Sequence, residues 1–299
     1  MVRPACRRAA VGAIGPLPVR VGHRAVRGGP HRTGDRLRSD PAIARHGNRG
    51  ARIVKRRSVI AGLGALFATG CSKVADSSAG QALFKVSNEW HRKAQRALTG
   101  RKAMAPEFSR AQISPYFRGN GSLTVGTPGY AAALESGFAD WRLLVTGLVE
   151  HPLSLSMDNI RRLPQRTQIT RHDCVEGWSA IGEWTGPQLS MLLEAAKLKP
   201  EARFIVFHCA DRLRGQPYYE SIDLDDAFHP QTIVAHALNG APLPERNGAP
   251  LRMRIERQLG YKHAKYLTLI EAVASLEQIR GGQGGYWEDV AGYQWYAGA

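Results

Sequence analysis

The hydrophobic positions between residues 111 and 299 change period from segment to segment, which predicts strands and helices in alternation. Residues 141–149 and 203–209 are apolar runs of strand length, and the second is continuous enough for a strand buried on both faces. Residues 188–197, between the two runs, carry apolar side chains at helical spacing: Leu189, Leu192, Leu193 and Ala196. The pattern therefore predicts a helix between two core strands.

Two later segments extend this pattern. Residues 251–256 alternate apolar with charged side chains, which is typical of a strand with one buried face. Residues 232–238 are predicted as a short helix, because the Asn-Gly pair at 239–240 favours a left-handed stop. Without a regular strand-helix-strand rhythm, the mixture predicts an α+β fold and one domain at residues 111–299.

The charge of the chain is concentrated at its N-terminus. The 299 residues have a formal net charge of +16. Residues 1–57 hold 14 Arg and one Lys against two Asp, a net of +13, so residues 58–299 carry only +3. A nearly neutral body excludes a histone-like nucleic-acid binder, and the lack of a long apolar run excludes a polytopic membrane protein.

Residues 1–52 are rich in Arg, Gly and Pro and have no apolar period. They cannot bury enough surface to offset chain entropy. We expect a disordered leader or the product of a start codon placed too far upstream, and we prefer the second. A transit peptide and an RNA-binding arm stay open as alternatives.

An export signal is predicted at residues 53–71. Lys55, Arg56 and Arg57 precede an uncharged segment, residues 59–71, that is too short to span a membrane. Adjacent arginines before a weakly hydrophobic segment indicate a twin-arginine signal, the route for folded proteins. We therefore expect a periplasmic protein that is exported with its cofactor already inserted.

The same segment ends in the pattern of a lipoprotein processing site. Small residues at 68–70 precede Cys71, which would carry a lipid anchor. Cleavage nearby, without an anchor, stays open as the alternative. Residues 72–110 are predicted as a tether that contains a helical stretch at residues 84–98.

Four cysteines, at positions 6, 71, 174 and 209, form no CxxC pattern, so a structural zinc site has almost no support. Cys174 and Cys209 remain in the body, where a disulfide between them is one interpretation. Cys174 lies among titratable neighbours in the segment RHDCVEGWS, which we expect to favour the thiolate. A single thiolate suffices for a metal whose organic cofactor supplies other sulfurs. A cysteine hydrolase is the weaker alternative, because no independent Asn or Asp signature accompanies His172.

The motif CVEGWS at residues 174–179, followed by WTG at 184–186, resembles the molybdenum-ligating segment of the sulfite oxidase family. The similarity is greatest to its bacterial, methionine-sulfoxide-reductase-like branch. Residues 137–149 and 238–266 resemble further motifs in the same order, so the resemblance covers roughly residues 111–280. It implies a mixed-sheet molybdopterin-binding domain of the sulfite oxidase type. It also implies a molybdenum-molybdopterin cofactor whose dithiolene provides two sulfurs and whose metal Cys174 ligates.

The resemblance further implies cofactor contacts at matching positions, which are Asn247, Arg252, His263 and Lys265. The side-chain chemistry suits these roles, because Arg and Lys neutralise a phosphate and an Asn amide hydrogen-bonds pterin edges. Solvated strand charge is the alternative for Arg252 and Lys265.

Three more residues are implied with open alternatives. Cys209 stands where the reductase-like branch has a threonine that contacts the cofactor, so we expect it to form a pocket wall. Asn120 stands where the family has a pterin-contacting asparagine, although the aromatic pair that follows in that branch is missing. Arg171 is expected to be catalytic, holding an anionic or sulfoxide oxygen near the metal; a surface or pterin-facing charge is its alternative. We expect Trp178 and Trp184 to pack around the cofactor.

The sequence thus predicts a molybdenum oxidoreductase that transfers an oxygen atom and two electrons. Reduction of a sulfoxide or N-oxide, small or protein-bound, is preferred, with sulfite oxidation as the alternative. No haem-binding segment with paired histidines is evident, so we expect a separate electron-transfer partner, a membrane or soluble cytochrome. A cofactor-free binding lipoprotein on the same fold is the alternative of another class. That alternative gives no reason for an unpaired cysteine in CVEGW.

Overall fold

The computed structural model describes residues 77, 90, 93–97, 100 and 103–298, all within the unit Ala61–Ala299. The predicted leader, the export signal with Cys71 and most of the tether lie outside the described residues. Within the tether, residues 93–97 are helical. In the described part of the chain, no helix has the length and apolar character needed to cross a membrane.

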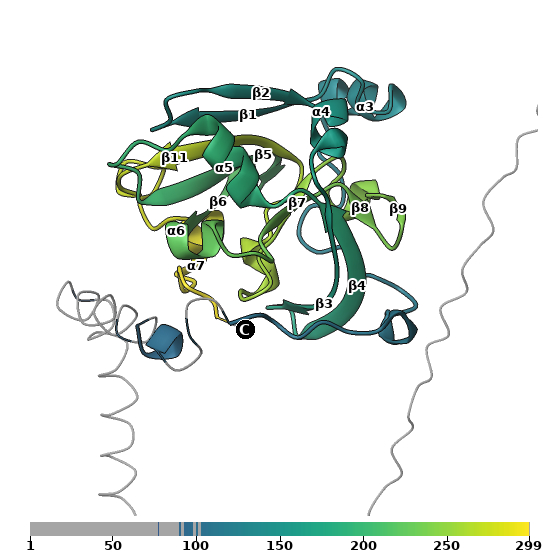
Figure 1. Ribbon diagram of the computed structural model, residues 1–299, viewed down its shortest axis with the longest axis horizontal. Coiled ribbons are helices and arrows are strands. Elements are labelled where there is room, and N and C mark those ends of the chain that lie inside the picture. Colours follow the sequence, from purple (N-terminus) through teal and green to yellow (C-terminus); the bar gives the residue numbers. More distant parts are fainter. Residues whose placement is uncertain (1–76, 78–89, 91–92, 98–99, 101–102, 299) are drawn as a thin grey trace, which may run out of the picture. The chain divides into compact units, whose positions relative to one another are not determined.

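A mixed five-stranded sheet in the order β2-β1-β11-β5-β6 forms the centre of the domain (Figure 1). Its strands are β1 (Arg142–Gly147), β2 (Leu153–Ser156), β5 (Phe204–Leu213), β6 (Gln216–Asp223) and β11 (Leu267–Val273). β1 and β11 run parallel, and the other neighbours are antiparallel. The strands predicted at 141–149 and 203–209 are β1 and β5, and the mixed α+β fold is confirmed.

Helix α5 (Leu189–Ala196) crosses the sheet in Figure 1 and confirms the predicted helix. Its apolar side chains are buried in one core cluster with Leu143, Ile205 and Phe207 of the sheet. Lys197 ends the helix in a left-handed conformation with φ 58°. The remaining helices are α3 (Pro128–Glu135), α4 (Met157–Arg162), α6 (Leu224–Ala227) and α7 (Tyr286–Ala291). Single 3-10 turns are η1 (Arg110–Gln112), η2 (Glu245–Asn247) and η3 (Gly260–Lys262).

A long antiparallel hairpin of β3 (Arg166–Cys174) and β4 (Trp178–Gly186) extends from the sheet region (Figure 1). It belongs to a second sheet in the order β3-β4-β8-β9, with β8 at Ala237–Leu238 and β9 at Ala241–Pro242. At the base, a Cβ on Gly186 would overlap the Val234 carbonyl, so glycine allows the two backbones to meet. The last hairpin pair before the turn is Cys174 with Trp178.

The predicted helix at residues 232–238 is wrong. This segment forms β7 (Ile233–Ala235) and β8, which pair with β10 and β4. Both strands are too short to show an alternating pattern, so periodicity could not separate strand from helix. Asn239 and Gly240 do have positive φ angles of 54° and 76°. They form the two-residue turn between β8 and β9, a conformation that Asn-Gly pairs favour in hairpins.

The strand predicted at 251–256 exists as β10 (Arg252–Arg254), but it is buried on both faces instead of one. Arg252 and Arg254 lie over the ring of the fully buried Trp184, at 4.9 and 4.4 Å from its centroid. The strand's charged face is therefore covered by protein and not by solvent. This burial places two guanidinium groups beside the end of β3.

Candidate active site

The pleat of β3 orients Cys174. Alternate strand residues point to opposite faces, so His172 and Cys174 face inward while Arg171 and Asp173 face outward. Cys174 is 8% exposed. The backbone turns immediately after it, with Gly177 at φ 85° donating to the Cys174 carbonyl at 3.0 Å. The thiol thus lies at the tip of a rigid hairpin.

Cys174 opens onto a cleft that four of the predicted site residues line: Asn120, Cys174, His263 and Lys265. Two carboxyl groups, Glu176 and Asp211, lie in the same walls. Four aromatic side chains complete the lining: Tyr218, Tyr261, Trp287 and Tyr293. The structure therefore brings together residues from five separate parts of the described chain.

Arg252 is fully buried beside this cleft and interacts electrostatically with Cys174. Its Nη1 donates to the Asn247 carbonyl at 3.0 Å, but its Nε and Nη2 have no hydrogen-bond partner. Burial, and then the like charge of Arg254, lowers the pKa of Arg252 to about 9. A buried cation with unpaired donors is a binding site for an anion. The solvated-charge alternative for Arg252 is excluded.

Arg254 lies two residues further along the strand, and its guanidinium nitrogens have hydrogen-bond partners, unlike Nε and Nη2 of Arg252. Its Nε and Nη2 donate to the two carboxylate oxygens of Glu256 at 2.9 and 2.6 Å. Its Nη1 donates to His172 Nδ1 at 2.9 Å. This bond assigns the His172 proton to Nε2, which is buried and has no partner. Arg254 is therefore a structural residue that fixes one tautomer of the histidine beside Cys174.

His263 presents the complementary arrangement. Its Nε2 donates to the Ile255 and Gln258 carbonyls at 2.9 and 3.1 Å, and its Nδ1 is buried without a partner. Burial lowers the pKa of both His172 and His263 well below the usual range, so both rings are neutral. The ring centroids lie 5.1 Å apart. Together they offer an unpaired donor and an unpaired acceptor.

Lys265 carries the second cation of the cleft and is 5% exposed, so it is not a solvated charge. Its Nζ donates to the carbonyls of Ser122 and Arg246, the latter at 3.0 Å. Burial, and then Arg252, lowers the pKa of Lys265 to about 7. Gly248, with φ 105°, packs against its side chain, where a Cβ would lie 2.7 Å from Lys265 Cβ. A glycine at position 248 therefore leaves the space that the Lys265 side chain occupies.

The two asparagines lie at the edge of the same region. Asn120 Oδ1 is buried without a partner. Asn247 is 2% exposed and its Nδ2 reaches the Arg118 carbonyl only at 3.4 Å. Both amides thus have hydrogen-bonding capacity to spare.

Both body cysteines are free thiols, so the disulfide alternative is wrong. Burial raises the pKa of the Cys174 thiol, whereas the neighbouring charges of Arg252 and Arg118 lower it, so these neighbours favour the thiolate and burial opposes it. Burial raises the pKa of Cys209 still further, and its side chain packs against two core clusters. Cys209 pairs through its backbone with Leu267 on β11. Its side chain supports the core instead of lining the cleft.

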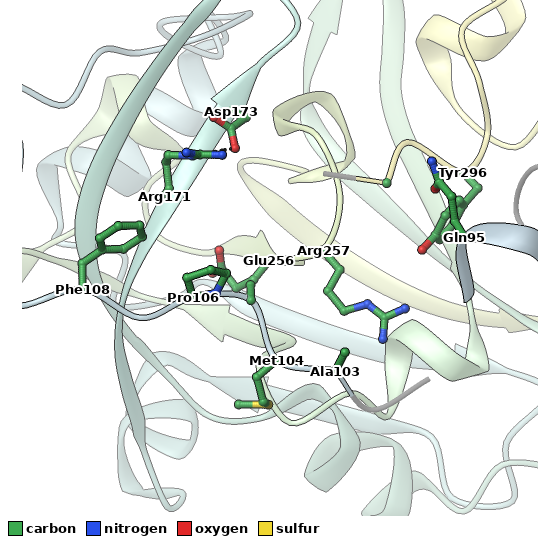
Figure 2. A pocket seen from close by; sticks show the side chains of 12 residues that line it. Gln95, Ala103, Met104, Pro106, Phe108, Arg171, Asp173, Glu256, Arg257 and Tyr296 are labelled. Atoms are coloured by element: carbon green, nitrogen blue, oxygen red, sulfur yellow. Dashed lines mark hydrogen bonds and ion pairs between the residues drawn. The ribbon is translucent and has the colours of Figure 1, made fainter. Parts of the chain in front are cut away.

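Arg171 does not join this site. It lies on the outer face of β3, is 57% exposed and donates to Asp173 at 2.9 Å. Figure 2 shows it in a separate cleft with Asp173, Phe108 and Glu256. The strand pleat explains the difference, because residues 171 and 174 are an odd number of positions apart. The surface-charge alternative for Arg171 is the one that the geometry supports.

Sequence reasoning missed several residues of the cleft. Arg254 had a local signal, since it repeats the charge of Arg252 at strand spacing within an apolar run. Trp184 is fully buried beneath the guanidinium groups of Arg252 and Arg254 and does not line the cleft, so its packing around the cofactor stays a prediction. The aromatic residues at 287 and 293 belong to no motif and had no signal in the sequence.

The model of the oxidoreductase molybdopterin-binding domain matches residues 131–278. A protein of Azospira oryzae, named as the protein-methionine-sulfoxide reductase subunit YedZ1, is 35% identical over 247 residues. That alignment covers 83% of this chain and 87% of the relative. This chain belongs to the molybdopterin-binding oxidoreductase family. It is therefore an enzyme of the sulfite oxidase type, with molybdenum-molybdopterin as its cofactor.

Other members of the family are similar over shorter stretches. The protein-methionine-sulfoxide reductase catalytic subunit MsrP of Campylobacter jejuni is 34% identical over 155 residues, 47% of this chain and 52% of that protein. MsrP of Xanthomonas campestris is 34% identical over 158 residues, 49% of each chain. The chain thus spans about half the length of these reductases. The crystal structure of the sulfane dehydrogenase SoxCD from Paracoccus pantotrophus aligns with TM-score 0.42 and 23% identity, over 48% of this chain and 41% of that one.

The buried groups fit the family's cofactor. The single thiolate of Cys174 at the cleft fits a metal whose other sulfurs come from the cofactor. The unpaired Nε and Nη2 of Arg252 suit the phosphate of molybdopterin. His172 Nε2, His263 Nδ1 and Asn120 Oδ1 provide unpaired donors and acceptors for a heterocycle.

Proposed function

We propose that this enzyme is a sulfoxide reductase acting on methionine sulfoxide, free or in proteins. The observation that carries the proposal is the arrangement at the end of β3, where Cys174 opens onto a cleft beside the unpaired cation Arg252. The names of the Azospira and Campylobacter relatives point to the same substrate class. Overall, a sulfoxide, two electrons and two protons give a thioether and water.

In this proposal, Cys174 ligates the metal, while Arg252 and Lys265 hold the anionic tail of the cofactor. Asn247 and Asn120 hydrogen-bond its pterin, as do His172 and His263. When bound, the cofactor supplies two-electron oxygen-atom transfer. The polypeptide fixes one thiolate at a hairpin tip and prearranges buried donors, so little reorganisation accompanies binding.

The protein also needs a proton source, because the departing oxygen leaves as water. Asp211 lines the cleft with a buried oxygen, Oδ1, that has no hydrogen-bond partner. Burial raises the pKa of this carboxyl group, and the pKa of Lys265 nearby is about 7. Burial therefore favours the protonated form of the Asp211 carboxyl group. We assign Asp211 as the acid that delivers a proton to the departing oxygen.

Sulfite oxidation is the alternative reaction. Glu176 and Asp211 line the cleft with Cys174, whereas Arg171, the charge expected to hold an anionic or sulfoxide oxygen, lies outside it. The carboxyl group of Glu176 adds negative charge to the cleft, which disfavours an anionic substrate and tolerates a neutral sulfoxide. Purified holoenzyme with a reduced viologen dye should consume methionine sulfoxide. Robust cytochrome c reduction by sulfite, without sulfoxide-dependent dye oxidation, would refute the proposal.

A cofactor-free binding lipoprotein is not supported by family membership, and elemental analysis for molybdenum tests this directly. Molybdenum at about one atom per chain is the expected result. A preparation from a molybdenum-replete host that lacks the metal would contradict it.

The electron source in our proposal is a separate protein, a membrane or soluble cytochrome. The subunit wording in the names of the relatives supports a partner. Co-purification of a haem protein that reduces the dye-free enzyme would test the proposal. If no reduced cytochrome supports turnover of an enzyme that is active with the dye, the proposed partner is refuted.

We also propose a periplasmic location reached through the twin-arginine route, with Cys71 as a lipid anchor. The support is the pair Arg56-Arg57 before a short apolar segment. Replacing both arginines by lysine should leave a folded, molybdenum-loaded precursor in the cytoplasm. Cys71→Ser should release the exported protein from membranes. Unchanged export of the lysine variant would contradict the proposed route.

A further inference from the structure

Three of the aromatic residues in the cleft form a continuous surface, which we call the aromatic wall: Tyr261, Trp287 and Tyr293. Trp287 and Tyr293 stack with centroids 5.6 Å apart and planes at 22°. Tyr261 meets Tyr293 at 5.1 Å and 70°. All three line the cleft that contains Cys174. One side of the cleft is therefore largely aromatic.

A buried ion pair holds the two halves of the wall together. Tyr261 is followed by Lys262, and Trp287 is followed by Glu288. The lysine Nζ lies 2.6 Å from Glu288 Oε1 and 2.6 Å from Glu220 Oε2, and all three side chains are almost fully buried. In both dipeptides the aromatic ring faces the cleft and the charged side chain that follows it is buried in the interior. The ion pair ties η3 to α7.

Two further contacts limit how far the wall can open. The Tyr261 hydroxyl donates to the Gln294 carbonyl at 2.6 Å. The Tyr293 amide donates to the Trp287 carbonyl at 3.3 Å, across the left-handed Gly292 at φ 65°. The segment after α7 is therefore folded back so that residues 287 and 293 stack. The wall is a built surface and not a chance meeting of exposed rings.

Two of the three wall residues lie beyond the part of the chain that provides the proposed cofactor contacts, and the third, Tyr261, lies within it. The family model matches residues 131–278, so Trp287 and Tyr293 lie beyond it. The groups that suit the cofactor, Arg252 and His263, lie before that boundary. The wall faces the cleft from the side contributed by the C-terminal segment. Its chemistry thus suits the substrate better than the cofactor.

We propose that the aromatic wall binds the methyl-sulfur end of a methionine sulfoxide side chain and so determines the enzyme's specificity. Methyl-sulfur groups contact aromatic rings favourably, and flat rings bury the adjoining methylene groups. A small hydrophilic anion gains nothing from such a surface. Lys262 and Glu288 are positioning residues in this proposal. It rests on the proposed sulfoxide reduction and adds which part of the chain selects the substrate.

The test compares Trp287→Leu and Trp287→Phe in holoenzyme, with N-acetyl-methionine sulfoxide amide as substrate and a reduced viologen dye as donor. We expect Trp287→Leu to raise KM about tenfold, equal to about 1.4 kcal/mol. The kcat and molybdenum content of Trp287→Leu should stay within about twofold of the parent enzyme. Trp287→Phe should have a KM close to that of the parent enzyme. Trp90→Leu removes a 70% exposed tryptophan outside the cleft and serves as the matched control.

The ion pair is tested in the same assay. Glu288→Ala should raise KM in the same direction, and Glu288→Gln, which still accepts a hydrogen bond from Lys262, should restore it. An unchanged KM in Trp287→Leu, or a loss of kcat and molybdenum without a KM effect, overturns the assignment of the wall. If the parent enzyme itself reduces no sulfoxide, the proposed function fails instead. The two failures are therefore distinguishable.

Discussion

Arg252→Met gives the most discriminating prediction, because it should stabilise the cofactor-free protein while preventing cofactor retention. The substitution replaces a fully buried guanidinium that has two unpaired nitrogen atoms with an apolar chain of similar length. In the cofactor-free protein the charge has no counterion in contact with it among the described residues. Removing it relieves a desolvation penalty.

The size of this effect follows from the pKa of Arg252. A fall of about 3.5 in pKa, to about 9, corresponds to about 5 kcal/mol at ~1.4 kcal/mol per pH unit. The substitution also removes two stabilising interactions of the guanidinium. These are the hydrogen bond to the Asn247 carbonyl, which contributes about 1 kcal/mol, and the contact with the Trp184 ring, which contributes about 2 kcal/mol. The net gain in unfolding free energy is about 2 kcal/mol, which raises Tm by about 4–8 °C.

The pH dependence has a definite sign. Because the folded state lowers the pKa of this base, the penalty is complete below pH 9 and is relieved as the pH rises through 9. The stabilisation by Arg252→Met should therefore be constant from pH 6 to 8. It should shrink above pH 9.

The assay is thermal unfolding, by circular dichroism, of protein made in a host that cannot synthesise molybdopterin. Molybdenum content is measured in parallel on protein from a competent host. Arg254→Met is the matched control: its guanidinium is fully paired with Glu256, so breaking that pair should lower Tm. If Arg252→Met lowers Tm as Arg254→Met does, or retains parental molybdenum, Arg252 is not the anion site.

Three more predictions concern the cleft. Cys174→Ser should keep the fold and lose most turnover, because a hydroxyl is a harder, poorer ligand for this metal; unchanged turnover with molybdenum bound would refute the ligand. Since the pKa of Lys265 is about 7, its hold on an anion should weaken as pH rises through 7. Pterin binding to the cofactor-free parent enzyme, followed by fluorescence, should weaken there, while Lys265→Arg, which stays charged, should flatten the profile; identical profiles would contradict this. Asp211→Asn should lower kcat for sulfoxide by about 10²-fold while molybdenum content and KM persist, and an unchanged kcat would remove Asp211 as the acid.

The elements that the sequence predicts well are those whose length exceeds one period. The apolar runs of β1 and β5 and the helical spacing in α5 each extend over several residues, and each is present. The error at residues 232–238 arises because β7 and β8 have three and two residues. Their strand conformation depends on pairing with β10 and β4, which are distant in sequence and leave no local pattern.

The site residues show the same difference between features with a local sequence pattern and features that depend on distant contacts. Cys174, His263 and Lys265 belong to local motifs, and the structure places them in one cleft. Arg171 also lies next to the motif, yet the strand pleat turns it away, a geometric fact that a sequence distance of three does not carry. The aromatic wall depends on an ion pair between residues 26 positions apart. No spacing rule predicts such a contact.

The residues that line the Cys174 cleft come from positions as far apart as 120 and 293. No short fragment of the growing chain therefore contains the cleft, because the proposed cofactor contacts extend from Asn120 to Lys265 and the aromatic wall is complete only with α7. The bound cofactor would link early and late segments and stabilise only the folded form. A chain that holds the cofactor is therefore one in which these distant segments have already folded together.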